Sequence, residues 1–103
     1  MDADAAWEQV ERDELAVDGV APGTGFGRSS GLRVGGRIYA IRHPDGLVLK
    51  LPEARVGELI EADDGQAWGP SPGRLMREWV AVGEAACGRW AELAAEARRF
   101  VSG

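Results

Sequence analysis

The middle of the chain alternates hydrophobic and polar residues in short runs that are separated by turn signals. The runs 32–34 and 37–41 flank the pair Gly35–Gly36, and a Gly-Gly pair in this position is typical of a two-residue β-hairpin. A third run, 47–51, follows Pro44-Asp45-Gly46, which suits a three-residue loop with glycine in the left-handed position. The pattern therefore predicts three consecutive antiparallel strands.

The two turns fix the register of these strands, and the register assigns each side chain to one face of the sheet. The first turn pairs Leu32 with Tyr39, and the second pairs Ile41 with Leu49. We expect the core face to hold Leu32, Val34, Tyr39, Ile41, Leu47, Leu49 and Leu51. We expect the outer face to hold Arg33, Ile38, Ala40, Arg42, Val48 and Lys50.

Helical periodicity precedes and follows these strands. A first helix is expected over residues 3–15, with Asp2 or Asp4 as its cap. A second helix begins at Pro52, because proline is tolerated in a first turn, and a final helix spans 88–101. The buried stripe of the second helix is expected to be Val56, Leu59 and Ile60.

Two further strands are predicted at 66–68 and 77–82, and the glycine-rich connection 18–31 has room for a short irregular strand near 25–27. The resulting element order is α-β-β-β-α-β-β-α. This order predicts an α+β fold with two layers, in which an antiparallel sheet carries its helices on one face.

The 103 residues suit a single domain. We divide this domain into an acidic N-terminal helix (1–17), the connection and a body (32–103). Seven acidic residues and one basic residue lie within residues 1–27, whereas the remaining chain has eleven basic and ten acidic residues. The net charge of −5 provides no general attraction to phosphate backbones, so nucleic-acid binding is not the expected function.

A single cysteine, no apolar segment long enough to span a membrane and no hydrophobic signal segment are seen in the sequence. These features favour a reducing, cytoplasmic location.

Residues with catalytic potential are isolated from one another in the sequence. The segment Gly23–Gly27 lacks the glycine spacing and the following helix of a phosphate-binding loop. His43 is the only histidine and Cys87 the only cysteine, so the sequence contains no cluster of metal ligands and no recognisable Cys-His motif that would activate the thiol. We therefore expect no catalytic residues, no metal and no cofactor, and hence no enzyme.

The expected outer face combines apolar side chains with basic ones, as protein-interaction surfaces do. A second basic feature is the pair Arg74 and Arg77, whose guanidinium groups could clamp an acidic group. The residues that we expect to mediate interactions are Arg33, Ile38, Ala40, Arg42, Val48, Lys50, Arg74 and Arg77.

Two stretches carry a resemblance to a known family: Leu-Lys-Leu-Pro-Glu at Leu49–Glu53 and Met-Arg-Glu-Trp-Val at Met76–Val80. With the preceding hairpin and the final helix, they make residues 24–102 resemble the TfoX N-terminal domain, which is similar to the YjbR/MmcQ proteins. The resemblance implies a cytoplasmic bacterial protein with a fold similar to type III secretion chaperones. It supplies no catalytic residues.

The expectation from the sequence is therefore a non-enzymatic interaction or regulatory module that binds a protein partner or a second copy through the outer sheet face. Two alternatives remain open. One is a nucleic-acid-binding regulator that uses the basic residues of the same face, and the other is a small-ligand-binding protein or enzyme with an unrecognised pocket.

Overall fold

A six-stranded antiparallel sheet and three α-helices make up the computed structural model, which describes residues 2–24, 30–71 and 73–103. The helices are α1 (Ala3–Leu15), α2 (Glu53–Glu61) and α3 (Trp90–Ser102), and a 3₁₀ helix (Glu84–Arg89) leads into α3. The strands are β1 (Val20–Pro22), β2 (Gly31–Val34), β3 (Arg37–His43), β4 (Gly46–Lys50), β5 (Gly65–Trp68) and β6 (Met76–Val82). The predicted α+β class and the antiparallel sheet are confirmed.

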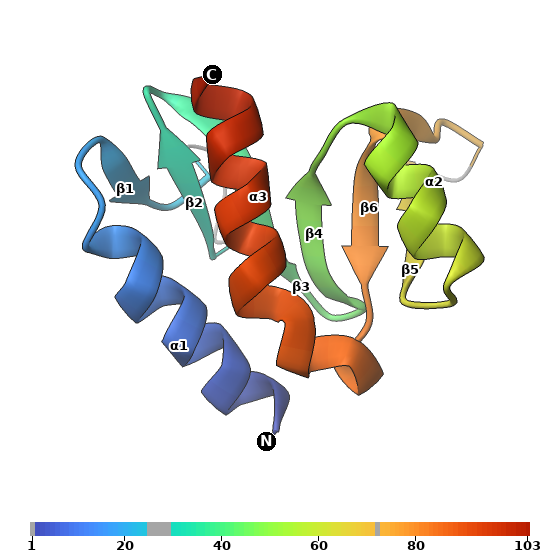
Figure 1. Ribbon diagram of the computed structural model, residues 1–103, viewed down its shortest axis with the longest axis horizontal. Helices are drawn as coiled ribbons and strands as arrows, with labels where there is room; N and C mark the ends of the chain where they lie inside the picture. Colours follow the sequence, from blue (N-terminus) through green and yellow to red (C-terminus); the bar gives the residue numbers. More distant parts are fainter. Residues whose placement is uncertain (1, 25–29, 72) are drawn as a thin grey trace.

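The sheet has the strand order β1-β2-β3-β4-β6-β5, and its helices lie on one face (Figure 1). Helix α3 crosses β3 and β4 in the centre, whereas α2 packs over β5 and β6 at one end. Helix α1 packs beside α3 and lies next to β1 at the opposite end. Strand β1 was not predicted at its position, and the strand suggested near residues 25–27 lies outside the described residues.

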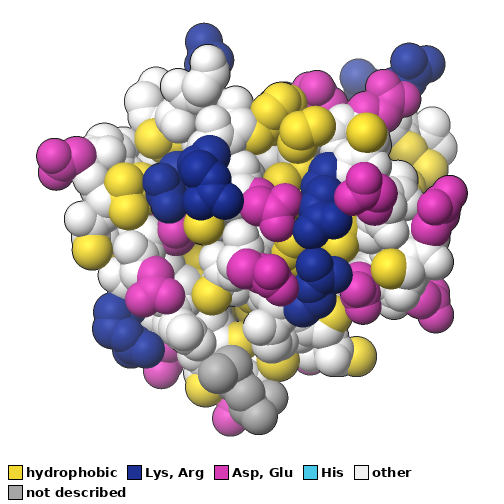
Figure 2. Space-filling model, in the orientation of Figure 1, with side chains coloured by type: hydrophobic (Ala, Val, Ile, Leu, Met, Phe, Trp, Pro, Cys, Tyr) yellow, Lys and Arg dark blue, Asp and Glu magenta, His cyan; other side chains and the backbone are white. Residues whose placement is uncertain are grey.

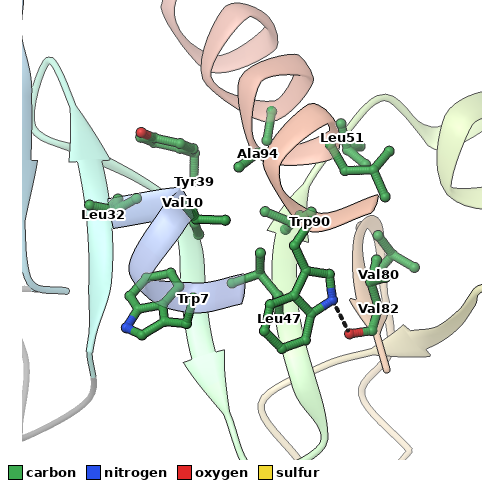
Figure 3. Packing of buried hydrophobic residues seen from close by; sticks show 14 of the residues in the cluster. Trp7, Val10, Leu32, Tyr39, Leu47, Leu51, Val80, Val82, Trp90 and Ala94 are labelled. Carbon is green, nitrogen blue, oxygen red and sulfur yellow. Dashed lines mark hydrogen bonds between the residues drawn. The ribbon is translucent and has the colours of Figure 1, made fainter. Parts of the chain in front are cut away.

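Trp90, the first residue of α3, organises the main hydrophobic core. Its side chain is completely buried, and its indole Nε1 donates a 3.1 Å hydrogen bond to the carbonyl oxygen of Val82. Figure 3 shows Trp90 among side chains from the sheet and from α1, including Leu47 and Val10. The indole thus fills the space between the two layers while its only polar group is satisfied.

A buried carboxylate fixes α1 to the rest of the domain. Glu14, which is only 3% exposed, accepts hydrogen bonds from the hydroxyl of Tyr39 at 2.8 Å and from Nε of Arg98 at 3.0 Å. Burial, and then the hydrogen bond to this carboxylate, raise the pKa of Tyr39. The acidic helix is therefore an integral part of the fold, joined by one ionic cluster to β3 and α3.

The register of the central strands differs from the predicted one at two places. Leu32 faces Ala40 while Arg33 faces Ile38, so Tyr39 is the extra residue of a β-bulge. The second hairpin has a two-residue turn, because His43 pairs with Gly46. Each change shifts the alternation of side chains by one position.

These shifts correct three predicted positions. Ala40 belongs to the core on the helix side, and Arg42 lies with it on that face, paired with Leu47. Ile41, predicted in the core, instead packs with Val48 on the outer face. The two shifts cancel along β4, and the predicted burial of Leu47, Leu49 and Leu51 in the main core is therefore confirmed.

Candidate functional site

The outer face of the sheet carries a second, smaller hydrophobic cluster. Its buried members are Ile41, Val48, Trp79 and Ala81. Trp68 packs against Trp79 with ring centroids 5.8 Å apart, and the edge of His43 lies 6.3 Å from Trp68. This cluster is largely closed by its own side chains, so the face does not present the open apolar panel that the sequence suggested.

Arg42 is committed to contacts on the helix side. One guanidinium nitrogen binds a carboxylate oxygen of Glu84 at 2.8 Å, another donates to the carbonyl oxygens of His43 and Gly46, and the group lies 5.0 Å from the centre of the Trp90 ring. Because Arg42 and Ala40 lie on the face opposite Val48, the expected basic strip is divided between the two faces of the sheet.

The remaining predicted residues do lie on the outer face, but Val48 is completely buried there and so corrects the expectation that it is available to a partner. Two others already have partners. The ammonium group of Lys50 lies 5.5 Å from the centre of the Trp79 ring and 3.7 Å from a carboxylate oxygen of Glu78. Arg33 donates to the carbonyl oxygen of Pro22 at 3.3 Å, and Ile38 packs beside the outer cluster.

Three of the four exposed large hydrophobic side chains among the described residues lie at the end of the molecule that holds α2 and β5, and the fourth, Leu15, lies on α1. Ile60 is 40% exposed and Leu75 is 62% exposed, and they line one hollow of about 270 Å³ together with Ala67 and Met76. We call Ile60, Ala67, Leu75 and Met76 the edge patch. Exposed apolar groups that adjoin one another in this way mark interaction sites more often than isolated ones do.

The edge patch lies where the sheet ends, at strand β5. Helix α2 covers only β5 and β6, so Val56 and Leu59 are buried while Ile60 is not. The prediction that Ile60 belongs to the buried stripe was therefore wrong. Sequence reasoning also missed Leu75 and Met76 as interaction residues, although they lie between the two arginines and Met76 begins one of the stretches that carry the family resemblance.

Arg74 and Arg77 flank the edge patch, and both are exposed. Arg77 lines the same hollow as Leu75 and Met76. The backbone of Arg74 lies close to Gly69, just after β5, because a Cβ atom on Gly69 would collide with the Arg74 carbonyl oxygen. The structure thus brings the predicted arginine pair together with apolar side chains, and Arg77 also shares a hollow with Lys50 and Trp79 of the outer face.

Two further hollows continue the edge patch along the end of the sheet. The first, of about 410 Å³, is lined by Lys50, Glu53, Met76, Arg77, Glu78 and Trp79. The second, of about 560 Å³, shares Lys50 and Trp79 with it and extends to Ile38 and Phe100. Hydrophobic side chains (yellow) are visible at this edge, near the end of α3 and the start of α2 (Figure 2). Together the hollows form a shallow groove with apolar side chains, lined by basic residues (Lys50, Arg77) and by acidic ones (Glu53, Glu78).

Arginine side chains on the helical face beside this groove form ion pairs with neighbouring carboxylates. Arg55 binds Glu96 and Glu58, both at 2.9 Å, and these hydrogen bonds raise the pKa of Arg55. Arg89 pairs in the same way with Glu92 and Asp64. Figure 2 shows basic and acidic side chains interleaved over α2 and α3, an arrangement that leaves little net attraction for an anionic ligand.

The described residues bring together no group of three or more histidine, cysteine or acidic side chains able to hold a metal ion. Cys87 is buried in the main core, and His43 contacts Asp45 at 3.4 Å on the second hairpin. None of the helices in the described part of the chain combines the length and the apolar character that a membrane crossing requires.

Comparisons with protein-family models, with curated proteins and with solved structures found no match for this chain.

Proposed function

We propose that this protein is a non-enzymatic protein-interaction module of the TfoX N-terminal type, and that it binds another polypeptide through the edge patch. The observation that carries the proposal is the exposure of Leu75, Ile60 and Met76 side by side, with Arg74 and Arg77 at their border. Apolar side chains surrounded by arginine are characteristic of the anchoring regions of protein interfaces.

The two sequence stretches that resemble the family contribute residues to the surface next to the edge patch. Lys50 and Glu53 come from the first stretch, and Met76 to Trp79 come from the second, and all of them line the hollow next to the edge patch. Residues from the two most distinctive stretches of the proposed family therefore form one surface. The proposed cytoplasmic location and the proposed similarity to secretion chaperones depend on this assignment.

A capture experiment tests the proposed function. The full chain, immobilised, is exposed to extract from its native host and to a labelled second copy of itself. We expect the wild type to retain a specific protein, and Leu75→Asp to lose it. The matched control is Leu15→Asp, because Leu15 is another exposed leucine (40%, compared with 62% for Leu75) on α1, at the opposite end of the molecule (Figure 1). Failure of the wild type to retain any protein, or equal loss in the Leu15 variant, would contradict the proposal.

A further inference from the structure

The two edges of the described sheet differ in their capacity to pair with another strand. At one edge, β1 has only three residues and ends in Pro22, which lacks a backbone N–H group. At the other edge, β5 (Gly65–Trp68) contains neither proline nor a charged residue. Proline and charge are two of the means by which proteins protect sheet edges. Because β5 carries neither, we take it as the edge more open to pairing.

The two ends of β5 carry opposite charges. Glu61 and Asp63 precede the strand, and both are exposed. Arg74 lies beside Gly69, immediately after the strand, and is exposed too. None of these three side chains forms an ion pair with another residue in the part of the chain that the structure describes. Their charges are therefore available to a neighbour.

We propose that β5 pairs with β5 of a second copy of this chain, in antiparallel orientation, so that the two sheets become continuous. This inference rests on the interaction function proposed above and identifies the partner as the protein itself. The two copies are related by a two-fold axis that is perpendicular to the sheet, because this symmetry generates antiparallel edge strands and keeps both helix layers on the same side.

Charge complementarity is the reason for choosing a second copy. Antiparallel pairing centred between Gln66 and Ala67 places the residues before β5 of one copy opposite the residues after β5 of the other. The acidic end, with Glu61 and Asp63, then faces Arg74 of the partner, and the symmetry repeats this contact. Because one end of β5 is acidic and the other basic, two antiparallel copies of the strand place opposite charges next to each other at both ends.

The apolar contacts agree with this arrangement. Ala67 faces the helix side, since it pairs with Val80 of the main core. Ile60 of α2 lines the same hollow as Ala67. With both helix layers on one side, the two α2 helices approach across the axis, and their exposed Ile60 side chains become covered.

Charge exchange tests the proposal, with light scattering and native mass spectrometry as readouts. We expect the wild type to dimerise, and Glu61→Arg and Arg74→Glu each to raise the dissociation constant about tenfold or more, because each variant places like charges opposite one another twice. An equimolar mixture of the two variants restores attraction at both contacts, so heterodimers should form with the wild-type affinity. Glu8→Arg on the exposed face of α1 is the control and should dimerise normally.

Three results would overturn the inference: a wild-type monomer at several hundred micromolar, single variants that dimerise like the wild type, or a mixture that stays monomeric. A monomeric wild type that still captures a different protein through Leu75 would reject self-pairing and leave the proposed function intact. Circular dichroism of each variant establishes that a loss of dimer is not a loss of fold.

Discussion

The hydroxyl of Tyr39 donates a 2.8 Å hydrogen bond to the buried carboxylate of Glu14, and the two residues come from β3 and α1. The same carboxylate oxygen accepts from Arg98 of α3 at 3.0 Å. Three elements that are distant in the sequence therefore meet at one oxygen atom. Their contact makes the N-terminal helix a structural element of the domain, at the end of the molecule opposite the edge patch (Figure 1).

Removal of the Glu14 carboxylate should destabilise the fold strongly. Glu14→Ala leaves the guanidinium of Arg98 and the hydroxyl of Tyr39 without their shared acceptor, and breaking a buried ion pair in this way costs about 3–5 kcal/mol. Urea unfolding followed by tryptophan fluorescence measures the change. Glu8→Ala on the exposed side of α1 should alter stability by less than about 0.5 kcal/mol, and an equal effect of both substitutions would contradict the structural role of Glu14.

The raised pKa of Tyr39 predicts a loss of stability at high pH. In the unfolded chain the phenol ionises near its ordinary pKa of about 10, whereas burial and the Glu14 carboxylate keep it neutral in the folded protein. The stabilisation is complete below pH 10 or so, and above it the free energy of unfolding should fall by up to about 1.4 kcal/mol per pH unit. Urea titrations between pH 8 and pH 11 measure this slope.

Tyr39 is the only tyrosine in the chain, which gives this prediction a direct spectroscopic control. Phenolate absorbance should remain absent from the native protein at a pH where the urea-unfolded protein is ionised. The variant Tyr39→Phe should lose this contribution to the alkaline slope. A native tyrosine that titrates near pH 10 would show that the phenol is accessible and would contradict its burial.

The second hairpin depends on a glycine at position 46. Gly46 has a φ of 134°, and a Cβ atom there would collide with the carbonyl oxygen of Val82. Gly46→Ala should therefore cost at least about 2 kcal/mol. Gly57→Ala is the matched control, since no atom lies within 4 Å of its Cβ position in α2, and it should stabilise the helix by about 0.5–1 kcal/mol. Thermal denaturation of both variants checks the opposite signs.

A charged side chain introduced into the outer cluster should destabilise the fold as strongly as one introduced into the main core. Val48 is completely buried, so Val48→Asp places an unpaired carboxylate in an apolar site and should abolish stable folding. Leu75→Asp should change the free energy of unfolding by less than about 0.5 kcal/mol, because Leu75 is exposed. A folded Val48→Asp protein, detected by near-ultraviolet circular dichroism, would contradict the closed outer cluster.

The hydrophobic pattern was sufficient to predict most elements but not the register of the central strands. The helix over 3–15, capped by Asp2, and the strand over 77–82 are recognisable because their local signals agree with their tertiary environment. The bulge at Tyr39 has no such signal. It places two consecutive side chains, Tyr39 and Ala40, on the helix side, and strict alternation along the strand cannot represent this.

The candidate site could be predicted only in part for a related reason. Arg74 and Arg77 were identified from their spacing in the sequence, but the exposure of Ile60 depends on where the sheet ends beneath α2. Arg42 is the opposite example. The sequence predicts an exposed base, but in the fold its side chain contacts Trp90 and Glu84. Periodicity assigns a side chain to a helix or strand face, and the tertiary arrangement decides whether that face is covered.

Site-specific photo-crosslinking in the native host tests the central claim, that a polypeptide docks on the edge patch. A photoreactive amino acid at position 75 should form a covalent adduct, while the same amino acid at position 15, on the opposite end of the molecule, should not. The mass of the adduct identifies a second copy or another protein. Adducts from position 15 alone, or from neither position, would contradict the account.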